Sequence, residues 1–143
     1  MKRSRHHTGW AGALYVAAEL SRRGYDATLT FGNTPSLDLL CASPNGRPFK
    51  IQVKSLTAGN AVLIQKRLLD TDPQSDLFFA VVLVPANEEA PMEFRILTHH
   101  EVTELWKSMP KVKKDGHPYK PGMDGLNWGI IKPYKGGWEK LPK

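Results

Sequence analysis

The amino-acid sequence predicts an α/β domain in which a mixed β-sheet is flanked by helices. Three observations carry this prediction: a helix-forming segment opens the chain, three strand-like segments follow it, and a continuous apolar run comes later. The chain has 143 residues, close to the commonest size of one domain, so we expect residues 1–143 to fold as a single unit. The composition, 41% hydrophobic and 24% charged, is typical of a globular protein with a packed core.

The first segment after a short basic start predicts a helix. Residues 1–7 are expected to form a loose basic tail, and Thr8 is a suitable N-cap for a helix that ends at Arg23. Gly9 and Gly12 lower the helix propensity of its first turns. They mark either a close approach to a neighbouring backbone or simple fraying.

Three strands are expected next. Residues 25–31 alternate large apolar with small or polar side chains, which is the period of a half-buried strand. Residues 37–42 and 48–55 are separated by the turn-forming pair Asn45-Gly46. These two segments should pair as an antiparallel hairpin.

The second half of the chain begins with an ambiguous stretch. Residues 61–69 fit a short strand followed by a helical turn, and residues 77–84 form a continuous apolar run. Such a run is typical of a strand covered on both faces at the centre of a sheet. Another strand is expected over 92–97, and a capping-box pattern from Thr98 to Glu101 predicts the start of a helix.

That helix should end at Pro110, and a less regular segment follows. Residues 111–143 are rich in Lys, Gly, Pro and aromatic residues and predict an irregular basic and aromatic C-terminal segment. A short edge element is expected at 128–131, and Trp138 is expected to be an aromatic anchor.

Charge and apolar content limit the classes of partner. The chain carries 20 Lys and Arg against 14 Asp and Glu, a formal charge of +6, which favours polyanions such as nucleic acid. No apolar stretch approaches the roughly 20 residues needed to cross a bilayer, and the basic start leads into no apolar segment of the signal-peptide type. We therefore expect a cytoplasmic protein without a membrane partner. The single cysteine, Cys41, lies in an apolar run and is expected to be an inert buried thiol.

Asp38 is the most unusual residue of the predicted sheet. It interrupts an apolar strand, where an ionised carboxylate is costly unless it meets a cation or hydrogen-bond donors. On the partner strand Gln52 and Lys54 share one face because side chains alternate along a strand. A hairpin centred on the Asn-Gly pair would place Asp38 opposite Val53, and a shift of one residue would keep all of these groups close.

Two interpretations of this cluster follow from the residues. A carboxylate and an amide oxygen can supply two hard ligands for Mg²⁺, while an ammonium can orient a water or stabilise charge on a phosphate oxygen. Alternatively, Asp38 and Lys54 form an ion pair on a partly exposed face and Gln52 bonds to neighbouring backbone. The pattern alone favours neither interpretation.

The motif and its context resemble a known superfamily. The segment Asn33-Thr-Pro-Ser-Leu-Asp38, the hairpin, and Ile51-Gln-Val-Lys-Ser55 resemble the D-x(n)-(E/Q)-x-K signature of the PD-(D/E)XK nuclease superfamily, which includes many restriction endonucleases and Holliday-junction resolvases. The first helix, with its Gly-Trp-Ala-Gly start, and the later apolar strand follow the superfamily's α-β-β-β-α-β order. The whole chain, including its Trp-containing tail, is similar to small bacterial members.

The resemblance implies a restriction endonuclease-like core and Mg²⁺- or Mn²⁺-dependent hydrolysis of DNA phosphodiester bonds. Asp38 would be the metal-binding carboxylate, Gln52 would replace the usual Glu as second ligand, and Lys54 would assist the attacking water. Two positions depart from the pattern. Gln52 removes a negative charge, and Ala13 stands where related nucleases often carry a Glu on the first helix. Glu19 faces another side of that helix.

These departures keep other functions open. The main alternative is a catalytically weak or inactive relative that binds nucleic acid or a protein partner. A third function is partner binding with no role for nucleic acid. The partner we expect first is DNA, and the chain is also compatible with a homodimer.

Basic residues of the second half could form a phosphate-contacting surface or, equally, a solvated face. We expect nucleic-acid contacts above all from Lys66, Arg67, Lys113 and Lys114. Further basic residues of this set are Lys111, Lys120, Lys132 and Lys135. The histidine pairs at 6–7 and 99–100 lack the i, i+4 spacing of a helical metal site, so surface or capping roles are expected.

Overall fold

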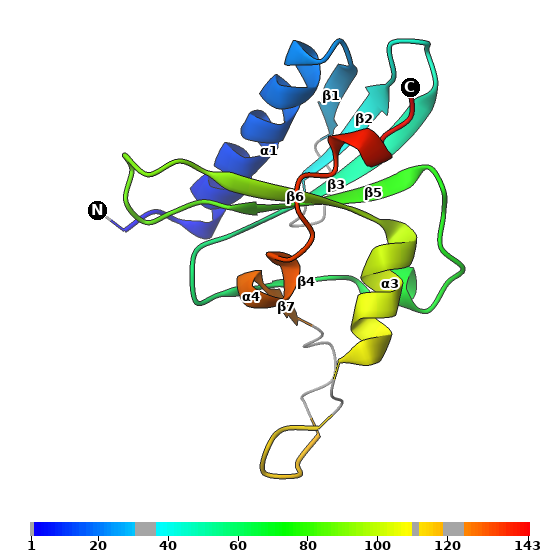
Figure 1. The fold of residues 1–143 in the computed structure, drawn as a ribbon. Coiled ribbons are helices and arrows are strands. Elements are labelled where there is room, and N and C mark those ends of the chain that lie inside the picture. Colours follow the sequence, from blue (N-terminus) through cyan, green and yellow to red (C-terminus); the bar gives the residue numbers. More distant parts are fainter. Residues whose placement is uncertain (1, 31–36, 110–111, 119–124) are drawn as a thin grey trace.

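The structure is a computed structural model that describes residues 2–30, 37–109, 112–118 and 125–143. It is an α/β fold with an open mixed sheet flanked by helices, as the sequence predicts (Figure 1). In chain order the elements are α1 (Arg5–Arg22), β1 (Asp26–Thr30), β2 (Leu37–Ala42), β3 (Pro48–Leu56), β4 (Ala61–Leu63), α2 (Lys66–Leu69), β5 (Leu77–Leu83), β6 (Glu93–Thr98), α3 (His99–Ser108), β7 (Gly125–Asn127), α4 (Trp128–Ile131) and the 3-10 helix η1 (Trp138–Lys140).

The main sheet has five strands in the order β1-β2-β3-β5-β6. Its neighbouring strands are antiparallel except β3 and β5, which run parallel. A parallel pair needs a crossover connection, and β4 and α2 lie in the crossover between these two strands. The strand β5 stands between β3 and β6 and is buried along nearly its whole length, which confirms the central position that its apolar run predicts.

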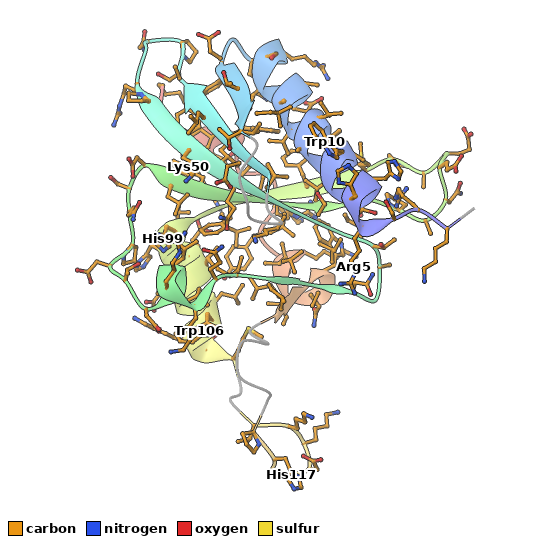
Figure 2. All side chains as sticks on the ribbon, turned by 180° about the vertical axis from the view of Figure 1, so that it is seen from behind. Arg5, Trp10, Lys50, His99, Trp106 and His117 are labelled. Atoms are coloured by element: carbon orange, nitrogen blue, oxygen red, sulfur yellow. The ribbon has the colours of Figure 1, made fainter. Side chains whose placement is uncertain are left out.

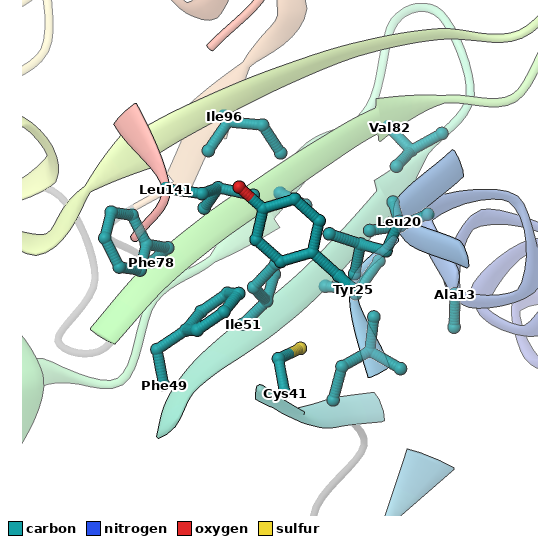
Figure 3. Close-up of a cluster of buried hydrophobic side chains, with 14 of the residues drawn as sticks. Ala13, Leu20, Tyr25, Cys41, Phe49, Ile51, Phe78, Val82, Ile96 and Leu141 are labelled. Carbon is teal, nitrogen blue, oxygen red and sulfur yellow. The ribbon is translucent and has the colours of Figure 1, made fainter. Parts of the chain in front are cut away.

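Two separate hydrophobic clusters cover the two faces of the sheet. On one face α1 packs against the sheet, and Leu20, Ile51 and Val82 belong to this cluster (Figure 3). On the other face Phe79 of β5 packs with residues of β4, α2, α3, β7 and α4, among them the buried Val102. Because side chains alternate along β3, its residues 51 and 53 face α1, whereas residues 52 and 54 face the opposite side.

Residues 5–7 belong to α1, so the prediction of a loose tail over 1–7 is wrong for these residues, and the predicted N-cap at Thr8 is wrong. The helix begins at Arg5, and the N-cap Ser4 accepts a hydrogen bond from a backbone N–H of the first turn. Arg3 fixes the position of the residues before the helix, because its Nη2 donates to the backbone carbonyls of residues 84 and 85 at 2.9 and 2.8 Å. The Thr8 hydroxyl lies inside the first turns and accepts from Arg3 Nε at 3.1 Å.

The C-terminal segment is more regular than the sequence predicts. The strand β7 pairs antiparallel with β4, and the expected edge element at 128–131 is the helical turn α4. Asn127 causes this difference, since its side chain caps the turn by accepting from the N–H of Ile130 at 3.0 Å. Trp138 is the predicted anchor: it packs against the α1-side cluster, with its ring 4.7 Å from that of Phe94.

Several local predictions are confirmed. The capping box at Thr98 and Glu101 is present at the start of α3, which runs to Ser108; Pro110 lies outside the described residues. Cys41 is a buried free thiol, and burial raises its pKa to about 12. Among the helices that the structure describes, none is long and apolar enough to cross a membrane.

Candidate metal centre

The β2–β3 hairpin brings Asp38 and Gln52 into direct register across the ladder. The antiparallel pairing confirms the hairpin, but the predicted register, with Asp38 opposite Val53, is wrong by one residue. Directly opposed residues of an antiparallel pair project from the same face, with Cβ atoms about 4.5–5.5 Å apart. The carboxylate and the amide are therefore closer to each other than the sequence suggests.

The turn explains the shifted register. The Asn45-Gly46 pair suggests a two-residue loop, yet the loop contains three residues, because the N–H of Ser43 donates to the carbonyl of Arg47 at 2.9 Å. Gly46 has a φ of 81°, the left-handed conformation that closes a three-residue hairpin loop. The extra loop residue moves every cross-strand partner by one place.

Two buried oxygens of this pair have no hydrogen-bond partner among the described residues. They are Oδ1 of Asp38 and Oε1 of Gln52, a residue only 7% exposed. A buried polar atom without a partner costs about 1–3 kcal/mol. A ligand that satisfies both oxygens would therefore stabilise the hairpin as well as bind to it.

The second carboxylate oxygen of Asp38 meets a cation that the sequence analysis missed. Lys50 Nζ lies 3.5 Å from Asp38 Oδ2, and the lysine side chain is about half exposed. The signal was present in the sequence, because Lys50, Gln52 and Lys54 occupy alternate positions of one strand and so share a face. The ion-pair interpretation assigned this partner role to Lys54.

Lys54 extends the same polar face by one further alternate position. Burial lowers the pKa of Lys54, and the negative charge of Asp38 partly opposes that shift. Its ammonium is therefore less solvated than that of a surface lysine and lies within electrostatic reach of the Asp38 carboxylate.

The helix α1 adds no carboxylate to this cluster. Ala13 is fully buried on the face of the sheet that carries Val53, opposite to the face of Gln52. Glu19 pairs with Arg22 and Arg23 at 3.0 and 2.6 Å. Across the described residues there is no group of three or more His, Cys, Asp or Glu side chains that could hold a metal.

The donor set of the hairpin nevertheless fits one kind of metal. Mg²⁺ prefers oxygen ligands, keeps several waters, and is often held by one or two protein carboxylates together with substrate phosphates. Asp38 and Gln52 offer two such oxygens, of which one carries a charge. They would hold Mg²⁺ or Mn²⁺ more weakly than a pair of carboxylates.

A pocket of about 340 Å³ opens beside the Asp38 ion pair. Its lining contains two cations, one carboxylate, and polar and apolar side chains: Lys50, Arg67, Leu68, Thr71, Gln74, Asp76 and Leu77. Lys50 belongs to both features, since it also contacts Asp38. Arg67, one of the predicted nucleic-acid contacts, thus lines the same pocket as a residue of the hairpin site.

The four predicted nucleic-acid contacts are not brought into one surface. Lys66 and Arg67 lie in α2, on the body of the molecule, where Lys66 pairs with Asp70, the residue that follows the helix, at 2.9 Å. Lys113 and Lys114 lie in the turn over 112–118, which projects from the body (Figure 1). Figure 2 shows His117 in this turn, far from Lys50. Lys111 and Lys120 lie outside the described residues, and Lys132 and Lys135 are exposed beyond α4.

The surface or capping role expected for His99 is wrong, because this side chain has a buried structural role. The side chain is fully buried, and its Nδ1 accepts a hydrogen bond from the backbone N–H of Gln74 at 2.9 Å. Its Nε2 therefore carries the proton and donates to the carbonyl of Leu68. Gln74 and Leu68 both line the pocket, so this histidine holds two parts of the pocket wall together. His6 and His7 are exposed in the first turn of α1, as expected.

No protein family, curated protein or solved structure matches the chain. A functional proposal for this protein therefore rests on its own residues and their geometry.

Proposed function

We propose that this protein is a metal-dependent nuclease that hydrolyses phosphodiester bonds of DNA, with the metal held by Asp38 and Gln52. The observation that carries the proposal is the cross-strand pair of buried oxygens without hydrogen-bond partners among the described residues. When bound there, Mg²⁺ or Mn²⁺ would polarise a phosphoryl oxygen and lower the pKa of a coordinated water.

The neighbouring lysines have different roles in this proposal. Lys54, whose ammonium is partly desolvated, is suited to stabilise negative charge that develops on a phosphate oxygen, because such interactions are stronger away from water. The ion pair of Lys50 with Asp38 is half exposed and contributes at most about 1 kcal/mol. A cation that binds the Asp38 carboxylate more strongly, such as a metal ion, would therefore displace Lys50 from it.

The topology supports placing the chain in the PD-(D/E)XK superfamily with a restriction endonuclease-like core. A helix is followed by an antiparallel three-stranded meander, and the next strand of the sheet runs parallel to the third. The crossover contains only the four residues of α2 as helix, which is short for the helix of the superfamily's order. This support is an analogy of fold, so the site itself has to carry the function.

A second candidate function is nucleic-acid binding without catalysis. One observation favours it: the site holds a single carboxylate, and its second oxygen ligand is a neutral amide. A protein of this kind would keep the basic surface and the fold while losing most of its affinity for metal.

Cleavage of plasmid and branched DNA with Mg²⁺ or Mn²⁺ tests the proposal. We expect Asp38→Asn and Lys54→Ala each to reduce cleavage by about 100-fold or more. Asp26→Asn is the matched control, because Asp26 is an exposed carboxylate of the neighbouring strand β1. Equal cleavage by wild type and all variants would assign the activity to a contaminant, whereas salt-sensitive binding without cleavage would select the second function.

A metal titration tests the site independently of activity. We expect the backbone amide signals of residues 38 and 52 to shift in NMR spectra as Mg²⁺ is added and to broaden as Mn²⁺ is added, and both effects to disappear in Asp38→Asn. Unchanged wild-type spectra at about millimolar metal would contradict the proposed metal site.

A further inference from the structure

The pocket beside the hairpin has the charge and position of an anion site. Its side chains include two cations, Arg67 and Lys50, the second of which also pairs with Asp38 of the hairpin, against one carboxylate, Asp76, so the lining itself carries a net positive charge. Gln74 adds an amide that can donate hydrogen bonds, and Thr71 adds a hydroxyl whose only hydrogen bond among the described residues is a long one of 3.5 Å to the carbonyl of Leu68. This combination suits a phosphate group better than a cation or an apolar ligand.

The guanidinium of Arg67 has an orientation and available donors that suit a phosphate ligand. Its Nε donates to Gln65 Oε1 at 2.8 Å, and this bond restricts the plane of the guanidinium. Among the described residues no further hydrogen bond to the guanidinium is present, so both Nη groups keep their donors for an incoming anion. Two parallel N–H donors match two phosphate oxygens, which gives arginine its preference for phosphate.

The wall of the pocket is fixed by a buried side chain. His99 bonds through one ring nitrogen to the backbone N–H of Gln74 and through the other to the carbonyl of Leu68. These bonds join the end of α2 to the segment before β5 from within the core. The pocket is therefore a supported feature of the fold rather than a gap between loose loops.

Distance along β3 links the pocket to the metal centre. Lys50 and Gln52 are two residues apart on the same face, which separates their side chains by roughly 7 Å at about 3.4 Å per residue. That separation is similar to the spacing of neighbouring phosphates in an extended nucleic-acid strand. A strand whose phosphate meets Asp38 and Gln52 can thus present its next phosphate to the pocket.

We propose that this pocket binds a second phosphate of the DNA strand, adjacent to the phosphate at the metal centre, through Arg67 and Lys50. This inference rests on the proposed function, because it places the strand along β3 past Asp38 and Gln52. It assigns a substrate-positioning role to Arg67 and excludes its neighbour Lys66, which does not line the pocket and pairs with Asp70.

Binding of a short fluorescent oligothymidylate, measured by anisotropy in EDTA, tests the pocket without metal or hydrolysis. We expect Arg67→Gln to weaken binding about tenfold and to make the dependence of log affinity on log salt shallower by about 0.7. The matched control is Lys66→Gln, which removes one charge from the adjacent position and should weaken binding less than about twofold. In wild type, inorganic phosphate should shift the amide signals of Thr71 and Gln74.

The outcomes separate this inference from the proposed function. Equal weakening by Arg67→Gln and Lys66→Gln, or no oligonucleotide binding by wild type, would overturn the phosphate pocket. If wild type also cleaves DNA and Asp38→Asn does not, the nuclease proposal survives that result. Selective weakening by Arg67→Gln in a protein that never cleaves DNA would keep the pocket and reject the nuclease.

Discussion

Gln52 lies directly opposite Asp38 in the β2–β3 ladder, and each residue places a buried oxygen without a described hydrogen-bond partner on the same face of the sheet. The neutral amide has a consequence for folding. A second carboxylate at this position would bring two like charges together in a partly buried site, which is unfavourable unless a cation lies between them. The amide avoids this repulsion in the absence of a cation, but it would bind a metal more weakly than a second carboxylate.

Exchange of this amide for a carboxylate should make stability depend on metal. In EDTA we expect Gln52→Glu to lower the free energy of unfolding by about 1–3 kcal/mol, because the new charge is buried beside Asp38. Millimolar Mg²⁺ or Mn²⁺ should restore most of this loss, since a ligand that binds only the folded state stabilises it. Urea unfolding with and without metal measures both effects.

Asn60→Asp is the control for this variant. It makes the same chemical exchange at an exposed residue in the turn after β3, where we expect a change within about 0.5 kcal/mol and no response to metal. A Gln52→Glu protein whose unfolding is equally insensitive to metal would contradict the metal centre.

Because of Lys54, the free energy of unfolding should increase as pH rises in the alkaline range. Burial lowers the pKa of Lys54 in the folded state below its ordinary value of 10.5, so between these two values the unfolded chain binds more protons. The contribution of this group therefore increases as pH rises from the lowered pKa towards 10.5. Lys54→Met should lose this rise and be relatively more stable near neutral pH. Urea unfolding over a pH series measures the difference.

The charge of Asp38 affects the pH at which this increase in stability begins. The Asp38 charge raises the pKa of Lys54 against the effect of burial, so Asp38→Asn should lower that pKa further and start the rise at lower pH. An NMR titration of the Lys54 side chain tests this directly. An identical Lys54 titration in wild type and Asp38→Asn would show that the two groups do not interact.

The sequence predicts the sheet well because its strands carry strong local signals. Alternation identifies β1, the continuous apolar run identifies β5, and the capping box identifies the start of α3. The residues of the candidate site were found for a related reason: a carboxylate in an apolar strand is rare without a partner.

The errors have two physical origins, which are contacts between residues distant in sequence and the geometry of a turn. The start of α1 is fixed by Arg3, which bonds to carbonyls 81 and 82 residues away. The hairpin register depends on whether Gly46 ends a two-residue or a three-residue loop, and Asn-Gly is compatible with both. The burial of His99 follows from backbone partners in another segment, which a local pattern does not contain.

Gly12 marks a close approach between α1 and β3, whereas Gly9 does not. A Cβ at Gly12 would lie 1.9 Å from Ser55 Oγ, 3.0 Å from Ser55 Cβ and 3.3 Å from Val82 Cβ. A Cβ at Gly9 would meet nothing within 4 Å. The close-approach explanation therefore applies to Gly12 alone, and Gly9 lies within the regular helix α1 rather than at a frayed end.

Alanine substitutions at these glycines should have opposite effects. We expect Gly12→Ala to lower the free energy of unfolding by about 1–3 kcal/mol, because the added methyl pushes β3 away beside Lys54. Gly9→Ala should raise it by about 0.5–1 kcal/mol through better helix propensity. Urea unfolding of both variants measures the difference, and a stabilising Gly12→Ala would show that the helix can shift without cost.

His99 should be required for the pocket wall more than its neighbour His100. The variant His99→Phe keeps an aromatic ring against Phe79 but leaves the N–H of Gln74 without its partner and the carbonyl of Leu68 with only the Thr71 hydroxyl at 3.5 Å. We expect the free energy of unfolding to fall by about 1–3 kcal/mol, since the N–H of Gln74 loses its hydrogen bond. The exposed control His100→Phe should change it by less than about 0.5 kcal/mol.

Hydrogen exchange separates a local role of His99 from a general loss of stability. If the histidine holds the pocket wall, the amide of Gln74 should exchange faster in His99→Phe even under conditions where the rest of the sheet stays protected. The same variant should weaken oligonucleotide binding in EDTA, because Thr71 and Gln74 would no longer be held beside Arg67. Unchanged exchange at Gln74 would mean that the backbone of this segment keeps its position without the imidazole. The packing of Leu68 and Leu77, rather than the hydrogen bonds of His99, would then determine the shape of the pocket.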